Sequence, residues 1–597
     1  MTMALAFALG ACSGGKGQGS LGGASGSGTG GAATGGAQGT GGQSGTGGAG
    51  SGGQIGTGGH ATNPSGTGGI GSGGAAAGTG GTATGGVGTG GAVAGTGGTA
   101  AGTGGAMTGT GGATTSGTGG ATMPGTGGAT MSGTGGAPPT SMIVTSAEGA
   151  YWQTGTLTPA SGTADVTVYS FQTFQTFAGF GGSFTERGWA ALQALSSSDR
   201  DRAMKLLFGA DGLRLAVGRI PIGATDYSLD RFSLDVTDSD TATDFALANF
   251  SLARDMQNMI PYVQAALDVN PALRLIADPW TPPVWMKTGP FSTSNTPSNY
   301  DGGNMKDDAQ TLSAYALYLS KFVQGYAQQG IAIEAVAPQS DPTFPQTFPS
   351  CVWTPALYLM FVRDYLGPRF LADDVKARIM VGMLANGAMD EQFATSIMAD
   401  PVAMSFITAF GVEDNMVNAL PTLTSSGLPV FQTEQDPGND PFQSGAQPQA
   451  MFSTIPANDY IFALQNWQQL SVWLNGGVAS YLVKHMALDT LGANLDVSRL
   501  WPQDALLVVD TTAQTLTITP AFYVLRHLSQ FVDPGAIRLG VQASGMMDPL
   551  AFRNPDGSIV TVLFNPGAAA QPVITVGGTT WQFSIPANGF ATIVKAP

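Results

Sequence analysis

The sequence predicts an α/β protein: a (β/α)8 TIM barrel with an attached β-sandwich domain, preceded by a long disordered segment rich in glycine and threonine. Eight short apolar runs alternate with amphipathic helical segments, which predicts the barrel. The runs are apolar throughout rather than at every second residue, as is typical of parallel strands buried on both faces. Short strands separated by turn residues follow to the C-terminus, which predicts the sandwich.

The barrel is predicted over residues 176–502. Helical patterns between its strands are clearest over residues 308–328 and 355–365. The eight strands are expected at residues 177–184, 212–221, 273–280, 331–339, 377–384, 406–412, 428–434 and 480–488.

The sandwich is predicted over residues 503–597. Residues 141–175 have similar β character, and we expect them to add strands to the same sandwich, so that both ends of the folded part meet. A turn signal, Asn-Pro-Asp-Gly, stands at residues 554–557. The later strands are expected at residues 505–510, 515–519, 558–565, 573–576 and 581–584.

The N-terminal part has two predicted segments. Residues 1–12 are an apolar run ending in Leu-Gly-Ala-Cys, which resembles a lipoprotein signal segment with Cys12 as the lipidation site. The run is too short to span a bilayer and lacks the expected positive start, and a chance apolar run is the alternative. Residues 13–140 are Gly/Thr/Ala/Ser-rich and bury too little apolar surface to offset the entropy of ordering, which predicts a disordered linker.

These features favour an exported protein, either secreted or anchored at the cell surface or outer membrane. Its only membrane contact would be the lipid anchor, and a monomer is expected. The net charge of −16, without clusters of lysine and arginine, argues against a nucleic-acid partner. Only His485 and His527 lie in the folded part, which excludes a histidine-rich metal site. Cys351 is left without a disulfide partner if Cys12 carries lipid.

Two acidic residues stand at the ends of predicted strands. Asp341 follows the strand at residues 331–339, and Glu434 ends the strand at residues 428–434. The carboxyl ends of parallel barrel strands meet at one rim, so both side chains are expected there. A retaining glycosidase needs such a pair, one carboxyl to protonate the leaving oxygen and the other to attack the sugar carbon. Asp341 precedes a proline, so an ordinary turn aspartate is the alternative for that residue.

Several motifs resemble those of glycoside hydrolase family 30, the glucosylceramidase and β-1,6-glucanase type. Residues 179–186 read Gly-Phe-Gly-Gly-Ser-Phe-Thr-Glu, and residues 219–228 read Arg-Ile-Pro-Ile-Gly-Ala-Thr-Asp-Tyr-Ser. Residues 278–287 read Asp-Pro-Trp-Thr-Pro-Pro-Val-Trp-Met-Lys. These are similar to the family's first, second and third strand motifs in that order. Residues 523–535 and 551–565 resemble its sandwich domain.

The resemblance implies retaining hydrolysis of a β-glycosidic bond in a glucosylceramide-, β-glucan- or β-xyloside-like substrate, a carbohydrate or glycolipid, with no cofactor and no metal. It implies Glu434 as the nucleophile and Asp341 as the acid/base. The substrate-binding residues expected on this basis are Arg219, Asp226, Trp280, Gln339, Ser340, Glu413 and Lys484.

This chain departs from the family pattern around the expected site. The family has Gln-Asn-Glu-Pro where residues 339–342 read Gln-Ser-Asp-Pro. Aspartate is one methylene shorter than glutamate, so the oxygens of Asp341 recede by about 1–1.5 Å. Ser340 replaces an asparagine that binds the sugar 2-hydroxyl in the family. Glu413 stands where the family has the tyrosine of His-Trp-Tyr, and Lys484 stands where it has a tryptophan.

Two hypotheses follow from these departures. In the first, the enzyme is active with a remodelled pocket, in which Lys484 and Glu413 form an ion pair beside Glu434 and Glu413 is an alternative proton donor to Asp341. In the second, the barrel has lost hydrolysis and acts as a surface carbohydrate-binding module, because misplacement by about 1 Å can cost roughly a hundredfold in rate.

Overall fold

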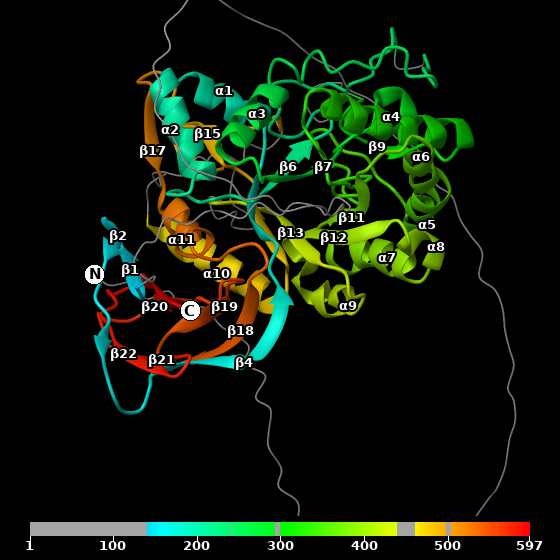
Figure 1. Cartoon of the computed structure of the whole chain (residues 1–597). Coiled ribbons are helices and arrows are strands. Elements are labelled where there is room, and N and C mark those ends of the chain that lie inside the picture. The colour runs from blue at the N-terminus through cyan, green and yellow to red at the C-terminus, as the bar shows by residue number, and fades with distance from the viewer. Residues whose placement is uncertain (1–139, 240–241, 293–298, 439–459, 497–502) are drawn as a thin grey trace, which may run out of the picture. The chain divides into compact units, whose positions relative to one another are not determined.

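A closed barrel of eight parallel strands forms the larger part of the fold (Figure 1). The computed structural model describes residues 140–239, 242–292, 299–438, 460–496 and 503–597. Each strand pairs in parallel with its two neighbours, which confirms the predicted barrel. In barrel order the strands are β5 (Gly179–Ser183), β6 (Val217–Pro221), β7 (Arg274–Asp278), β10 (Ala335–Val336), β11 (Arg378–Leu384), β12 (Ile407–Glu413), β13 (Val430–Gln435) and β14 (Ser480–Val483).

The barrel interior is packed with apolar side chains rather than open. Residues from seven of the eight strands and the segments beside them form one buried cluster that includes Val217, Ile276, Met380, Phe431 and Leu482. Inward-pointing side chains of alternate strands fill a barrel of this size in layers. Any site that is open to a ligand must therefore lie at an end of the barrel.

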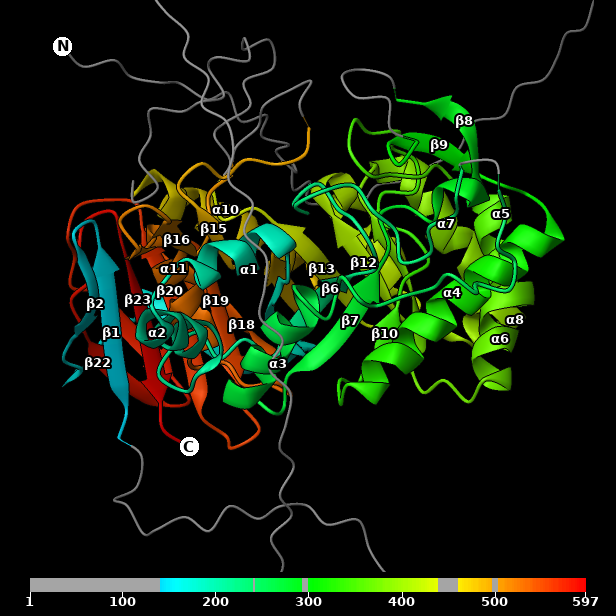
Figure 2. The same ribbon diagram turned by 90° about the horizontal axis from the view of Figure 1, so that it is seen from above.

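Helices surround the barrel strands (Figure 2). Several begin with a side-chain cap: Thr185 accepts a hydrogen bond from Gly188 N–H, and Asp308 accepts one from Thr311 N–H. The helices are α1 (Glu186–Gln193), α2 (Ser197–Phe208), α3 (Met259–Val269), α4 (Ala309–Gln328), α5 (Pro355–Met360), α6 (Gly367–Ala372), α7 (Gly387–Met398), α8 (Pro401–Met404), α9 (Leu420–Thr424), α10 (Ile461–Gly476) and α11 (Pro520–Ser529). The predicted helix at residues 355–365 is present as the short α-helix α5, which continues into a π-helical segment (Phe361–Leu366) and then into the α-helix α6.

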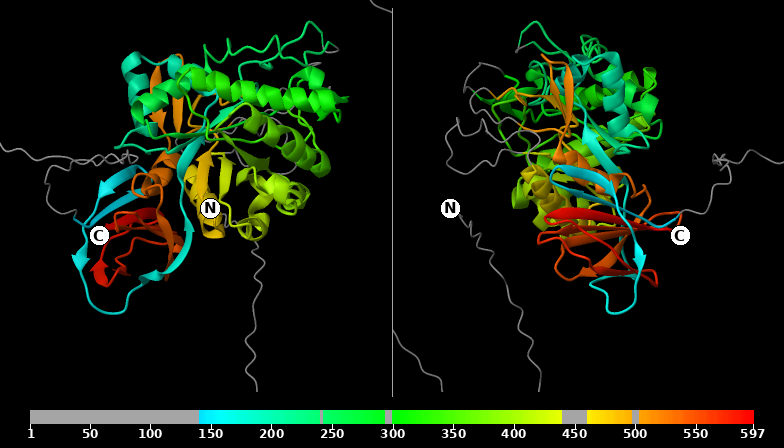
Figure 3. Two further views of the ribbon diagram at one scale, coloured as in Figure 1. Left: turned by 45° about the vertical axis from the view of Figure 1, so that its right-hand side comes forward. Right: turned by 90° about the vertical axis from the view of Figure 1, so that its left-hand side faces the viewer.

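Ten strands form one continuous sheet whose buried side chains make a separate apolar core. The strands from both ends of the described chain lie side by side in it, cyan beside orange and red (Figure 3): β1 pairs with β23, and β4 pairs with β18 and β21. In sheet order they are β2 (Ala150–Thr154), β1 (Met142–Ala147), β23 (Gly589–Lys595), β20 (Ile559–Asn565), β19 (Met547–Arg553), β18 (Ile537–Ala543), β4 (Val166–Thr176), β21 (Val573–Val576), β22 (Thr579–Gln582) and β3 (Thr158–Pro159).

Two strands expected in the sandwich lie elsewhere. The segments at residues 505–510 and 515–519 do form strands, β16 (Leu507–Asp510) and β17 (Thr515–Ile518), but they pair with β15 (Ala487–Asp489) in a separate three-stranded sheet. Leu507 and its neighbours are buried in the same large apolar cluster as the helices around the barrel. Strand propensity indicates an extended chain but does not specify its partner, which packing decides here.

Helix α11 connects the barrel to the sandwich through a buried histidine. His527 is hydrogen-bonded through Nε2 to Ser146 Oγ and through Nδ1 to Thr592 Oγ1, both at 2.8 Å. These hydroxyls belong to β1 and β23, so the imidazole ties the first strand of the fold to the last.

The predicted signal segment, with Cys12, and the predicted linker up to residue 139 lie outside the described residues. Among the helices that the structure describes, none is long and apolar enough to cross a membrane.

Candidate active site

Charged side chains gather at the carboxyl ends of the barrel strands. Arg219 comes from β6, Asp278 from β7, Glu413 from β12 and Glu434 from β13, and Lys484 directly follows β14. Four of these five side chains are buried, and Glu434 is 15 % exposed. Buried charges are retained only where they are paired or hydrogen-bonded, so their contacts define the site.

Arg219 is held by a two-pronged ion pair. Its Nε and Nη2 donate to the two carboxylate oxygens of Asp278, each at 2.8 Å, and Asp278 is fully buried. Its Nη1 donates to Glu434 Oε2 at 2.6 Å, and Nη2 also donates to Ser340 Oγ at 3.0 Å. The bidentate geometry fixes the plane of the guanidinium, so Arg219 presents Nη1 to Glu434 in a defined direction.

Lys484 supplies a second cation to the same carboxylate. Its Nζ lies 2.6 Å from Glu434 Oε1 and 3.0 Å from Asp226 Oδ2. The ammonium also lies 5.3 Å from the ring centroid of Trp280, within cation–π range. Glu434 therefore has a positive partner on each oxygen.

This environment keeps Glu434 ionised. Burial raises the pKa of the Glu434 carboxyl, but the Lys484 ammonium and the Arg219 guanidinium together lower it further than burial raises it, to about 2. Burial raises the pKa of Asp226 to about 6, although Lys484 opposes the shift.

Asp341 has the opposite environment. Its Oδ1 is buried and accepts no hydrogen bond from the described residues. Burial raises the pKa of the Asp341 carboxyl well above its usual value, and the negative charge of Glu434 raises it further. Its backbone is left-handed (φ 48°), and its N–H donates to the Met383 carbonyl at 3.0 Å, which ties the end of β10 to β11. Aspartate tolerates this conformation better than most residues.

Glu413 is not paired with Lys484, contrary to expectation. Its nearest cation is Arg219, with Nη1 3.6 Å from Glu413 Oε2. The Lys484 ammonium is instead held by Asp226 and Glu434. The pKa of Glu413 is raised well above its usual value, first by burial and then by the charges of Glu434 and Asp341.

The other expected binding residues divide into two groups. Trp280 is 6 % exposed and packs against Phe348, with ring centroids 5.7 Å apart. Gln339 is fully buried, and its amide nitrogen donates to the carbonyls of Trp280 (2.8 Å) and Ser340 (2.6 Å). Trp280 therefore lies at the site, whereas the side chain of Gln339 is used to hydrogen-bond the backbone around it.

One cavity joins five of the predicted residues. Its volume is about 20 Å³, roughly the space that one water molecule needs. Glu413, Gln339, Ser340 and Asp341 are not among its lining residues. The predicted residues that line it are Arg219, Asp226, Trp280, Glu434 and Lys484, beside Ser183, Phe184, Thr185, Pro221, Thr225 and Asp278.

Sequence reasoning missed three acidic residues of the site: Asp278, Asp436 and Asp414, which directly follows Glu413 and whose pKa desolvation raises to about 6. Asp278 is the partner that holds Arg219, and the signal for it was a carboxylate at the end of the neighbouring strand together with an arginine too costly to bury alone. Asp436 lies two residues after Glu434, and burial raises its pKa to about 7 although Lys484 opposes the shift.

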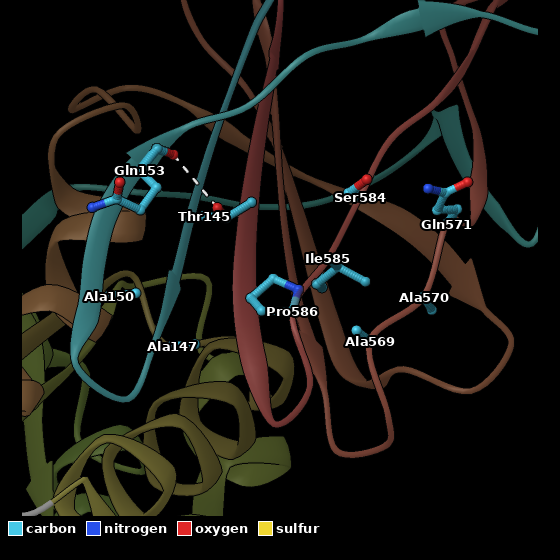
Figure 4. A pocket seen from close by; sticks show the side chains of 10 residues that line it. All are labelled: Thr145, Ala147, Ala150, Gln153, Ala569, Ala570, Gln571, Ser584, Ile585 and Pro586. Carbon is cyan, nitrogen blue, oxygen red and sulfur yellow. Dashed lines mark hydrogen bonds between the residues drawn. The ribbon is translucent and has the colours of Figure 1, made fainter.

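A larger pocket of about 580 Å³ lies on the sandwich, between the β1–β2 hairpin and two C-terminal segments (Figure 4). Its lining residues are Thr145, Ala147, Ala150, Gln153, Ala569, Ala570, Gln571, Ser584, Ile585 and Pro586. None of these side chains can exchange a proton near neutral pH, so this pocket offers no group for acid/base catalysis.

Family comparison agrees with this geometry. Residues 177–532 match the model of the glycosyl hydrolase family 30 TIM-barrel domain, and residues 535–593 match that of the family 30 β-sandwich domain. The chain belongs to glycosyl hydrolase family 30. The family match confirms the resemblance seen in the sequence and identifies the barrel as the family's TIM-barrel domain.

Relatives in this family carry different names. The chain is 28 % identical over 468 residues to putative glucosylceramidase 1 of Caenorhabditis elegans, covering 72 % of this chain and 83 % of the relative. It is 24 % identical over 451 residues to endo-1,6-β-D-glucanase neg1 of Aspergillus fumigatus, covering 70 % and 85 %. The crystal structure of SrfJ from Salmonella typhimurium superimposes with a TM-score of 0.65 at 20 % identity, covering 76 % and 99 %, which shows the shared fold.

Proposed function

We propose that this family 30 protein is an exported, retaining glycoside hydrolase that cleaves a β-glycosidic bond, with Glu434 as the nucleophile and Asp341 as the acid/base. One observation carries the proposal. The carboxyls of Glu434 and Asp341 interact electrostatically, and their pKa values are displaced in opposite directions, that of Glu434 downward and that of Asp341 upward. Such divergence is how glycosidases separate a nucleophile from a proton donor.

The reaction follows from these charge states. Asp341 donates its proton to the leaving oxygen while a Glu434 oxygen attacks the anomeric carbon, giving an ester to Glu434 and a free alcohol. Asp341, now a carboxylate, then takes a proton from the incoming water that hydrolyses the ester. Arg219 and Lys484 hold the Glu434 carboxylate in place and keep it ionised until it attacks.

The substrate class rests on the relatives and on the shape of the site. Relatives named glucosylceramidase and endo-1,6-β-D-glucanase favour a β-glucoside, and a β-xyloside is the alternative. A cavity of about 20 Å³ is far smaller than a sugar ring. The ring is therefore expected to lie across the cavity mouth against Trp280, with a hydroxyl reaching Asp226.

Export is inferred from the N-terminal sequence. It rests on the apolar run ending at Cys12 and on the Gly/Thr-rich segment that separates this run from the barrel. Membrane fractionation of cells that produce the wild type or Cys12→Ser tests it, since only the wild type should be retained in membranes. Equal distribution of the two proteins would contradict lipid anchoring.

A carbohydrate-binding module without turnover is the second candidate. It is favoured by the two cations on Glu434, which reduce its nucleophilicity, and by the short side chain at Asp341. This candidate predicts that sugars raise the melting temperature of the protein while no β-glycoside is cleaved.

The decisive experiment replaces Asp341 by glycine. Glycine adopts positive φ without strain, so Asp341→Gly removes the carboxyl at little backbone cost and leaves room for azide. With 2,4-dinitrophenyl β-glucoside or β-xyloside, which need no protonation to leave, azide should restore turnover and give the β-glycosyl azide. The matched control is Asp374→Gly, at an exposed aspartate with φ 54°, which should behave as wild type.

An α-glycosyl azide, or no effect of azide on an active variant, would contradict the assignment of Asp341. No turnover by the wild type on either substrate, together with thermal stabilisation by sugars, would establish the binding module instead.

A further inference from the structure

Glu413 and Glu434 share one nitrogen of Arg219. They are register partners on the adjacent strands β12 and β13. Arg219 Nη1 lies 2.6 Å from Glu434 Oε2 and 3.6 Å from Glu413 Oε2. The other guanidinium nitrogens are committed to Asp278 and Ser340. The two N–H groups of Nη1 donate to Glu434 Oε2 and, at 3.4 Å, to the Thr433 carbonyl. Nη1 therefore faces two carboxyls and hydrogen-bonds only that of Glu434.

The carboxyl of Glu413, which receives no hydrogen bond from Arg219, lies where a negative charge is unfavourable. Glu413 is 3 % exposed, and neither of its oxygens accepts a hydrogen bond from any residue that the structure describes. The charged groups that face it are Arg219 from β6, Glu434 from β13, Asp341 after β10, and Asp414 directly after β12. One cation stands against three acids, and the cation is already hydrogen-bonded to Glu434. Ionising a buried carboxyl without hydrogen bonds is costly, so Glu413 holds a proton.

We propose that Glu413 and Glu434 alternate as the anionic partner of Arg219 Nη1: Glu413 holds a proton while Glu434 is a free carboxylate, and Glu413 ionises when Glu434 becomes an ester. The second half rests on the proposed function, because only a nucleophile forms that ester. The first half concerns the resting protein alone.

The proton balance closes over one catalytic cycle. When the Glu434 ester forms, Asp341 has passed its proton to the leaving oxygen and Glu434 has lost its charge. The O–H bond of Glu413 then breaks, with the electron pair staying on oxygen and the proton passing to water. When water hydrolyses the ester, Glu434 regains its charge and Glu413 takes a proton back. Arg219 thus keeps one anionic partner at Nη1 throughout, which makes Glu413 a positioning residue rather than a second proton donor to the substrate.

The small number of glutamates makes this testable directly. The chain contains six of them: Glu148, Glu186, Glu334, Glu391, Glu413 and Glu434. Labelling the protein with [δ-13C]glutamate gives six carboxyl signals, and the signal lost in Glu413→Gln is that of Glu413. Glu391→Gln, at a partly exposed position of α7, is the matched control and should remove a different signal without moving the others.

In the wild type, the pKa of Glu413 is expected to lie well above the ordinary glutamate value near 4.3, because the carboxyl is buried beside Glu434 and Asp341. In Glu434→Gln, whose neutral amide mimics the charge of the ester, the pKa of Glu413 should fall by about one unit or more. An ordinary pKa for Glu413 in the wild type, or a raised pKa that Glu434→Gln leaves unchanged, would overturn the proposal. If Glu413→Gln does not fold, single Glu→Gln changes at the other five positions assign the remaining signal.

The outcome is separable from that of the proposed function, because titration needs no turnover. If Glu434→Gln lowers the pKa of Glu413 but keeps full hydrolytic activity, the shared charge stands and the nucleophile assignment fails. If Glu434→Gln is inactive while the pKa of Glu413 does not move, the nucleophile stands and the alternation fails.

Discussion

Lys484 and Glu434 are joined by an ion pair of 2.6 Å between Nζ and Oε1, while Arg219 occupies the other carboxylate oxygen at the same distance. Two cations on one carboxylate lower its pKa to about 2 in spite of burial. The same ammonium also forms an ion pair with Asp226, at 3.0 Å from Oδ2. Lys484 therefore connects the expected nucleophile to an expected sugar-binding residue. The consequences of this arrangement can be measured.

Replacing Lys484 by methionine should raise the pKa of Glu434. A group with a depressed pKa is ionised above that value, so wild-type kcat/KM should fall only in strongly acidic solution. In Lys484→Met the acid limb of the kcat/KM profile should move upward by about one pH unit or more, because one of two cations is lost. Lys484→Arg keeps a positive charge and should leave the limb nearly in place. An unchanged acid limb in Lys484→Met would show that Lys484 does not tune Glu434.

Replacing Asp278 by asparagine should destabilise the fold. The change leaves Arg219 buried with its two-pronged partner neutralised, and breaking a buried ion pair costs about 3–5 kcal/mol. Chemical denaturation measures the free energy of unfolding. The control is Glu334→Gln, which breaks the half-exposed pair with Arg274 and should cost about 0–1 kcal/mol. Equal losses for both variants would contradict a special role for Asp278.

The sequence predicts the barrel strands and the rim at which the site lies. Apolar runs locate all eight barrel strands, although the strand expected at residues 331–339 is reduced to Ala335–Val336 because only two residues complete the ladder with both neighbours. The carboxyl ends of those strands bring Arg219, Glu434 and Lys484 to one rim, because parallel strands present the same ends together.

Pairing and side-chain direction were harder to predict. The strands β16 and β17 were predicted as strands, but their partner β15 could not be inferred from local propensity. The ion pair of Lys484 with Glu413 was wrong because sequence position does not reveal that Asp226 competes for the same ammonium. Gln339 follows a strand like the other site residues, yet its amide nitrogen donates hydrogen bonds to the carbonyls of Trp280 and Ser340.

Replacing His527 by leucine should weaken the junction between α11 and the sandwich. The change removes one hydrogen bond from each of the buried Ser146 and Thr592 hydroxyls, which keep their bonds to Trp152 N–H and to the residue 527 carbonyl. Each lost bond should cost about 0.5–1.5 kcal/mol. Burial lowers the pKa of His527 to about 3, below the unfolded value near 6.5. The stability that neutral His527 provides is therefore present above pH 6.5 and lost as the pH falls toward 3.

The difference in unfolding free energy between the wild type and His527→Leu should therefore shrink by about 1.4 kcal/mol per pH unit below 6.5. Urea denaturation at pH 7 and pH 5 measures it. A difference that stays constant across this range would show that folding does not shift the pKa of His527.

The central claim is that Glu434 attacks the sugar, and trapping its ester tests this most directly. The wild type is incubated with 2-deoxy-2-fluoro-β-glucosyl fluoride and with the xylosyl analogue, and the labelled peptide is located by mass spectrometry. We expect time-dependent inactivation with one fluoro-sugar on Glu434 and no label in Glu434→Gln. A label on another carboxyl, or cleavage of an activated β-glycoside with inversion and no trapped ester, would contradict the account.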